Sequence, residues 1–438
     1  MIKKIALETI VSQSRLRQWS KIILVFVAGQ GAVQLTQLLS GFFLIHWLSV
    51  EEYAQYSIAF AFQSTAQVLV ELGISGSVIA LVGTRIHEKK VIGNYIKAGK
   101  FYRNRLFLVV GCVCVFAFPY VTYQHQWPIS VTIILLICIL TNLFFSGNTA
   151  FYITPLMIHK KLKDIYQTQL FSGVVRLSLL GLLYLGTFIN AWLAALTTSI
   201  MVWFNGFTFR KKSQEYIVEP EASDLTVRKE MTAYVKPVIP GIIYSAFSSQ
   251  ISLFIIGIFG VSQNIAEVGA LGRLGQMFMI FNMASSTLIV PYLAKQPKEN
   301  LSNKFAFILS GATAIAIILV LVGFFVPEPL LWIMGEKYAH LRQEVSLLML
   351  NSSILFINVL MWDMNCSRKW LWSWIPVVSI STNIILQLIM IITMDLSTTY
   401  NVLIFSVILS VFNLLNKIIV TLIGLKKTKN EINLLSGE

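Results

Sequence analysis

The sequence from residue 49 to residue 81 reads SVEEYAQYSIAFAFQSTAQVLVELGISGSVIAL and is mostly apolar or small after its first turn. A helix of about 20 such residues is long enough to cross a bilayer. One carboxylate, that of Glu71, interrupts the apolar run roughly in its middle. Because an ionisable group inside a membrane is costly, its presence predicts a buried partner or a water-filled cavity beside it.

The composition of the whole chain is that of a membrane protein. Its 438 residues are 56% hydrophobic and 12% charged, with a mean hydropathy of +0.72, whereas a soluble domain carries about a quarter charged residues. Reading for long apolar runs predicts an all-α integral membrane protein with about twelve transmembrane helices, at 22–47, 53–83, 106–124, 129–157, 165–186, 190–209, 235–259, 264–294, 305–326, 341–366, 370–394 and 398–424.

Lysine and arginine gather in alternate loops of this arrangement. Of the 34 such residues, 29 lie at the N-terminus or in 85–105, 160–163, 210–236, 295–304, 368–369 and 426–429. Cytoplasmic loops carry an excess of these residues, so both termini are predicted to be cytoplasmic. The formal net charge of +14 is then explained by topology, and no nucleic-acid partner is needed.

The sequence carries no motif for chemistry of its own. It contains no phosphate-binding loop, dinucleotide fingerprint, nucleophile elbow or zinc-protease motif. Its four cysteines lie in apolar segments and its five histidines are scattered, without metal-ligand spacing. The chain is therefore predicted not to be an enzyme and to need no metal or organic cofactor.

The most polar stretch, 210–236, divides the predicted spans six and six. It predicts an N-terminal six-helix lobe at 1–209, a cytoplasmic linker at 210–234 and a C-terminal six-helix lobe at 235–438. Ser223 or Asp224 could begin a helix inside the linker.

The two halves resemble each other. The stretch SQNIAEVGALGRLGQMFMIFNMASSTLIVPYL, residues 262–293, aligns with the opening stretch and places Ser285 opposite Gly73. Since both halves begin on the same side, they are predicted to be parallel repeats, related by a pseudo-two-fold axis along the membrane normal. Such architectures bind substrate between the halves.

Polar residues on single helical faces form the candidate substrate cavity: Gln30, Gln34, Gln37, Gln63, Gln67, Glu71, Arg176 and Arg273. The glutamines either hydrogen-bond neighbouring helices or line the cavity. The two arginines lie too deep in their spans for easy snorkelling, which favours a water-filled cavity over a structural ion pair. Glu71 either faces that cavity or pairs with Arg176, and Glu71 and Asp363 are weaker candidates for binding a coupling ion.

The segment 85–105 has an apolar face with Ile92, Tyr95, Ile96, Gly99 and Tyr102, and a polar face opposite. This pattern predicts an interfacial amphipathic helix on an anionic membrane leaflet. Its role is either to anchor the topology or to gather phosphate headgroups.

At the family level the sequence resembles the bacterial polysaccharide exporters and O-antigen flippases of the multidrug/oligosaccharidyl-lipid/polysaccharide (MOP) superfamily. The resemblance covers most of the chain and rests on patterns of small, polar and apolar residues: SVEEYAQYSIA, VELGISGSV and IHEKKVIGNYIKAGKFYRNRL in the first half, then VKPVIPGIIYSAFSSQISLFIIGIFG, VGALGRLGQ and STLIVPYLAK in the second.

The resemblance implies a flippase in the bacterial cytoplasmic (inner) membrane that moves a polyprenyl-pyrophosphate-linked oligosaccharide by alternating access. It implies membrane lipids, a polysaccharide polymerase and glycosyltransferases as partners, and Na⁺ or H⁺ as a coupling ion. The alternatives are a cation-coupled multidrug exporter of the same fold and a non-transporting scaffold for polysaccharide assembly. A peptidoglycan-precursor flippase is disfavoured, because such relatives commonly have two further helices.

Overall fold

The structure is a computed structural model that describes residues 28–285, 289–294, 296–297, 300–370, 372 and 374–436. These described residues form helices and connecting segments without a β-strand. Helical structure needs no partner strand to satisfy its backbone hydrogen bonds, which is what a span in lipid requires.

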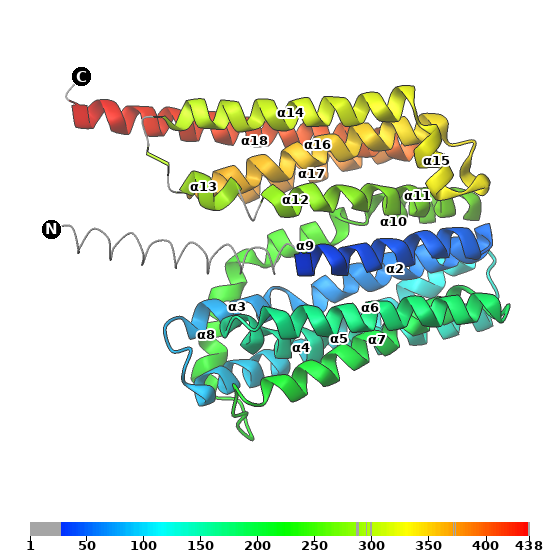
Figure 1. The fold of residues 1–438 in the computed structure, drawn as a ribbon, viewed down its shortest axis with the longest axis horizontal. Helices are drawn as coiled ribbons and strands as arrows, with labels where there is room; N and C mark the ends of the chain where they lie inside the picture. Colours follow the sequence, from blue (N-terminus) through cyan, green and yellow to red (C-terminus); the bar gives the residue numbers. More distant parts are fainter. Residues whose placement is uncertain are drawn as a thin grey trace, which may run out of the picture. The chain divides into compact units, whose positions relative to one another are not determined.

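The first half contains a helix over 28–47 and, as far as the linker, the helices α2 to α8 that Figure 1 labels, followed by one 3₁₀ turn. They are α2 (Val50–Glu71), α3 (Ile74–Val82), α4 (Lys89–Gln124), α5 (Ile129–Ile158), α6 (Leu162–Leu185), α7 (Ala191–Ser213), the linker helix α8 (Leu225–Val235) and the 3₁₀ turn η1 (Lys236–Val238).

The second half continues directly from η1. Its elements are α9 (Ile239–Ser248), α10 (Ile251–Phe259), α11 (Ser262–Gly275), η2 (Gln276–Phe278), α12 (Met279–Ala284), α13 (Val290–Ala294), α14 (Leu301–Phe325), α15 (Glu328–Met334), η4 (Glu336–Tyr338), α16 (Arg342–Ser367), α17 (Trp374–Thr393) and α18 (Thr399–Ser436).

Within the described residues, nine helices are long and apolar enough to cross a membrane, or ten if one bent pair counts as a span. The bent pair is Leu225–Ser248 with Ile251–Phe259, which meet at 51°. The run expected at 264–294 is divided among α11, η2, α12 and α13, and the run expected at 22–47 begins outside the described residues. The multi-pass membrane character is confirmed, while the count of twelve stays a prediction.

The chain packs as two compact units. The first takes the described residues up to Gly41, with Phe62–Tyr120 and Pro128–Ala246; the second takes Phe42–Ala61, Val121–Trp127 and the chain from Phe247. Contacts inside the second unit tie these early segments to late ones: Lys337 Nζ donates to the carbonyls of His46 (2.9 Å) and Leu48 (2.7 Å). These units have other bounds than the predicted lobes at 1–209 and 235–438, which stay a prediction.

The same helix pairs recur in both halves. In the first unit α5 and α6 pack against α7, and in the second unit α16 and α17 pack against α18. A repeated sequence is expected to repeat its packing in this way. The pseudo-two-fold axis itself stays a prediction.

A left-handed turn breaks the second span of the first half. Leu72 has φ 38° and Gly73 has φ 74°, between the end of α2 and the start of α3. Glycine adopts this conformation without steric cost, which favours Gly73 at the break. In the second half α12 ends at Ala284, directly before Ser285, the residue that aligns with Gly73. Ser285 itself keeps right-handed helical dihedrals, with φ −57° and ψ −57°, so the left-handed turn at Leu72 and Gly73 is not repeated at the aligned position.

The segment 85–105 differs from the prediction of a separate interfacial helix. From Lys89 onward it belongs to α4, which continues as one helix to Gln124. The apolar face expected on lipid headgroups is buried inside the first unit, with Ile92 and Ile96 fully buried and Tyr95 2% exposed. Other protein helices cover this face, so it serves as core.

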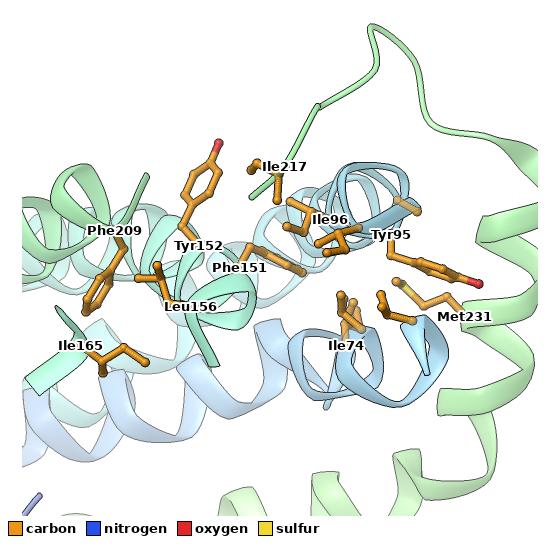
Figure 2. Close-up of a cluster of buried hydrophobic side chains, with 14 of the residues drawn as sticks. Ile74, Tyr95, Ile96, Phe151, Tyr152, Leu156, Ile165, Phe209, Ile217 and Met231 are labelled. Atoms are coloured by element: carbon orange, nitrogen blue, oxygen red, sulfur yellow. The ribbon is translucent and has the colours of Figure 1, made fainter. Parts of the chain in front are cut away.

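The linker is part of that core. Figure 2 shows Ile217 of the linker and Met231 of α8 beside Ile74, Tyr95 and Ile96 in one cluster of buried side chains. Helix α8 begins as the sequence predicts, because the Asp224 side chain accepts from the Thr226 amide at 2.8 Å. The linker packs on α3 and α4 (Figure 1).

Polar contacts fix the start of the linker, and we call Lys100, Tyr152, Val218 and Glu219 the linker clasp. Lys100 Nζ lies 3.1 Å from Glu219 Oε1, and the Tyr152 hydroxyl donates to the same oxygen at 2.7 Å. The Val218 amide donates to the Lys89 carbonyl at 3.1 Å. Burial alone would raise the pKa of Glu219, but the Tyr152 hydrogen bond and the charges of Lys100 and Arg210 outweigh it, so this pKa lies below its ordinary value.

The lowered pKa of Glu219 predicts a pH dependence of stability. The stabilisation is present above the unfolded-state pKa of about 4.3 and is lost as the pH falls through the lower folded-state pKa. Between about pH 6 and about pH 3 the wild-type protein should therefore lose more stability than Glu219→Gln, by at most about 1 kcal/mol because the pair is partly exposed. Thermal unfolding of both proteins across this range measures the difference, and parallel curves would contradict it.

Candidate functional site

A polar cavity of about 290 Å³ lies in the first unit, between the α2–α3 segment and α5. Its residues recur at intervals of three or four on each side, so one face of each helical segment lines it. We call it the Glu71 pocket; it is lined by Gln67, Glu71, Ser75, Gly76 and Ile79 from α2–α3, and by Ser146, Thr149, Ala150, Ile153, Thr154 and Met157 from α5.

Neighbouring turns hold the Glu71 carboxylate in this pocket. The Ser75 hydroxyl donates to Glu71 Oε2 at 3.5 Å, and the Gln67 side chain also hydrogen-bonds the carboxylate. Both partners are four residues away, where helical side chains meet. The structure thus brings together two predicted site residues, Gln67 and Glu71.

The positive charge that acts on Glu71 is that of Arg103 on α4. Arg103 is 4% exposed, and its Nη2 donates to the Leu143 carbonyl and to Ser146 Oγ, the latter at 3.2 Å. A methyl group at Gly147 would overlap the guanidinium, so glycine makes room for it. Because a buried charge is costly without hydrogen bonds and an opposite charge, Arg103 and Glu71 stabilise each other.

The other predicted residues of the first half lie outside this pocket. Gln30 and Gln34 are half-buried and Gln37 is exposed on the helix over 28–47, and Gln63 is half-buried on α2. Arg176 is half-buried on α6, in the first unit. Their role in a substrate cavity stays a prediction.

Arg273 lies in the second unit, on α11, among aromatic rings of α2. Its guanidinium carbon is 4.0 Å from the centroid of the Phe60 ring, a cation–π contact. Its Nη1 donates to Gln276 at 3.3 Å. Arg176 and Arg273 belong to different units, so a cavity that they share stays a prediction.

The second unit has its own acid and base near a helix end. Asp363 accepts a hydrogen bond from Ser285 at 3.0 Å, and the charge of Lys417 acts on it. Lys417 Nζ also donates to the Asn358 carbonyl at 3.0 Å. Glu71, with Arg103 nearby, lies just before the break at Gly73. Asp363, with Lys417 nearby, accepts a hydrogen bond from Ser285, the residue that aligns with Gly73. Each half therefore places a carboxylate and a cation near this aligned position.

Glu267 on α11 is a buried carboxylate outside the predicted set of site residues. It is 5% exposed and accepts from Gln263 at 3.1 Å and Thr399 at 2.5 Å, with His340 Nε2 at 2.9 Å. These contacts join α11 to α18 and to the segment before α16. Among the described residues no group of three or more histidines, cysteines or carboxylates could hold a metal ion.

No protein-family model and no curated protein sequence matches this chain. Solved structures match the chain. An inward-facing multidrug resistance MATE family transporter of the MOP superfamily is 10% identical, with a TM-score of 0.68 over 90% of this chain and 96% of that one. The lipid II flippase MurJ, in an inward closed conformation, is 12% identical, with a TM-score of 0.68 over 92% of this chain and 90% of that one.

A eukaryotic MATE transporter, AtDTX14, is 11% identical, with a TM-score of 0.58 over 95% of this chain and 99% of that one. At such low identity the likeness establishes a common fold and not a common substrate. The chain therefore has the fold of MOP superfamily transporters, as the sequence resemblance implies, along nearly its whole length.

Proposed function

We propose that this chain is a flippase that moves a polyprenyl-pyrophosphate-linked oligosaccharide across the bacterial inner membrane by alternating access. The Glu71 pocket carries the proposal. It places a carboxylate, an amide and several hydroxyls between membrane-spanning segments, next to the buried Arg103. Ionisable and polar groups inside a membrane mark substrate or ion pathways, because lipid gives them no solvation.

The substrate class matches the polar groups that the chain offers. A pyrophosphate needs cations, which Arg176 and Arg273 offer, and sugars need the hydrogen-bonding groups of the glutamines and hydroxyls. The prenyl chain stays in the bilayer. Transport would rock the N-terminal lobe against the C-terminal lobe, driven by Na⁺ or H⁺ at Glu71 or Asp363, or by consumption of the product. The likeness to a lipid II flippase supports this class of substrate.

A cation-coupled multidrug exporter is the second candidate, supported by the likeness to a multidrug transporter. A site for cationic drugs needs uncompensated acids. Glu71 has Arg103 beside it, and Asp363 has Lys417. This pairing of charges favours the flippase.

A deletion strain tests the proposal directly. Its lipid-linked oligosaccharides are extracted and measured beside the mature surface polysaccharide. We expect the intermediate to accumulate and the polymer to be lost, with rescue by the intact gene but not by a gene carrying Arg176→Ala and Arg273→Ala. Unchanged lipid-linked sugars together with increased drug sensitivity would favour the exporter. Full rescue by the double variant would favour a scaffold.

A further inference from the structure

We infer that the Glu71 pocket binds one sugar ring of the transported oligosaccharide through the hydroxyl donors of the ring, and that the pyrophosphate binds elsewhere. The inference rests on the proposed function for the source of the sugar. It is carried by the direction of the hydrogen bonds around the pocket.

The hydroxyls on the α5 side already donate within the protein. Ser146 donates to the Leu143 carbonyl at 2.9 Å, Thr149 to the Val202 carbonyl at 3.1 Å, and Thr154 to the Ala150 carbonyl at 3.0 Å. A hydroxyl has one hydrogen and two lone pairs. What these three side chains offer a ligand is therefore acceptor oxygen.

The donors near the pocket are directed at protein acceptors. Ser75 and Gln67 hydrogen-bond the Glu71 carboxylate. Arg103 donates to Leu143 and Ser146 and is 4% exposed. The Glu71 carboxylate is itself a pure acceptor. The pocket thus presents an excess of acceptors.

This excess of acceptors determines whether the pocket binds the pyrophosphate or a sugar of the substrate. Phosphate oxygens are acceptors and carry negative charge, so against Glu71 and the three hydroxyl oxygens they would gain at most the second N–H of the Gln67 amide. Sugar hydroxyls bring the donors that the pocket lacks. A carboxylate can also accept from two neighbouring hydroxyls at once, because it has two oxygens.

The apolar side chains of the pocket suit the faces of a sugar ring. Ile79 and Met157 are 44% and 47% exposed, and Ile153 lies between them along the lining. Burial of ring C–H groups against them contributes the non-directional part of binding. A volume of about 290 Å³ is at the lower limit for small-molecule sites, which suits one ring rather than a whole repeat unit.

Saturation-transfer NMR on the purified full chain in lipid nanodiscs tests the inference. The probes are methyl glycosides of common hexoses and N-acetylhexosamines, inorganic pyrophosphate, and tetraphenylphosphonium. The variants are Glu71→Gln and the nearly isosteric Thr154→Val. Thr198→Val is the matched control, since its hydroxyl makes the same bond to a carbonyl four residues earlier, at 3.2 Å, and does not line the pocket.

We expect at least one glycoside to bind, with affinity reduced about tenfold or more in Glu71→Gln, because a hydrogen bond to a charged group is lost. Thr154→Val should weaken it about threefold, and Thr198→Val should leave it unchanged. Pyrophosphate should not compete with the glycoside. The inference is overturned if no glycoside binds, if binding ignores both pocket variants, or if pyrophosphate or tetraphenylphosphonium displaces the sugar.

The deletion strain distinguishes a failure of this inference from a failure of the proposed function. Accumulated lipid-linked oligosaccharide together with glycoside binding that ignores Glu71 would overturn the pocket assignment alone. Binding that depends on Glu71, in a strain whose lipid-linked sugars are unchanged, would overturn the flippase and leave a sugar site.

Discussion

Replacing Arg103 by leucine should destabilise the protein by about 3 kcal/mol and abolish rescue of the deletion strain. The Glu71 carboxylate would remain inside a membrane-spanning segment without its nearby positive charge. The Leu143 carbonyl and Ser146 would lose their donor. Removal of the positive charge beside the half-buried Glu71 is costly, because the carboxylate is left uncompensated.

A second substitution separates stability from transport. With Glu71→Leu added to Arg103→Leu, both charges are gone, and apolar replacements of a buried pair are often neutral. We expect stability close to that of the wild type but no transport, since the pocket has lost its carboxylate. Thermal unfolding in detergent measures the first quantity, and accumulation of lipid-linked oligosaccharide the second.

Arg105→Leu is the matched control for the charge pair. Arg105 lies two residues further along α4 and is exposed. Its guanidinium carbon is 4.1 Å from the centroid of the Phe101 ring. Its loss should change stability by less than about 1 kcal/mol. Equal instability of the single and double pocket variants would show that Arg103 and Glu71 are not coupled.

Gly93→Ala should release the linker from α4 and destabilise the protein by about 2 kcal/mol. Glycine to alanine inside a helix ordinarily stabilises by about 0.5–1 kcal/mol. At this position the sign reverses, because the added methyl group would overlap the backbone carbonyl of Val218. That segment is also fixed by the hydrogen bond that the Val218 N–H donates to the Lys89 carbonyl and by the Lys100–Glu219 ion pair.

Limited trypsin digestion measures the release of the linker. Cleavage between Lys211 and Lys229 should be several-fold faster in Gly93→Ala, since proteolysis follows the population of the opened segment. Gly181→Ala on α6 is the control, because nothing lies within 4 Å of the added methyl group. It should leave cleavage unchanged and raise the melting temperature slightly. Unchanged cleavage in Gly93→Ala would contradict the role assigned to the clasp.

The membrane helices could be predicted well because each is a long apolar run. The expected span at 53–83 corresponds to Val50–Val82, and the expected start of the linker helix corresponds to Asp224. These features depend on local composition and local hydrogen bonding. The division of 264–294 into short helices could not be read in this way, since its composition is as apolar as that of a continuous span.

Arg103 is absent from the predicted cavity because it lies in 85–105, a stretch whose lysines and arginines indicate a cytoplasmic loop. Yet it follows Ile92, Ile96 and Gly99 at intervals of four, three and four, so it lies on the apolar face of α4. An arginine in line with buried residues is the signal that could have found it. Its proximity to Glu71 joins α4 to the α2–α3 segment, and such contacts between distant segments are not contained in helical periodicity.

The contacts of the linker clasp can form earlier during translation than the contacts of Lys337 in the second unit. Every contact of the clasp, and the packing of Met231 in the cluster with Ile74 and Tyr95, joins residues that precede Val235. Since domains generally fold as units during translation, with the N-terminal one first, these contacts are available before the second half of the chain has left the ribosome. The carbonyls of His46 and Leu48 instead wait for Lys337. The C-terminal end of the helix over 28–47 is thus completed only after synthesis has passed residue 337, well into the second half of the chain.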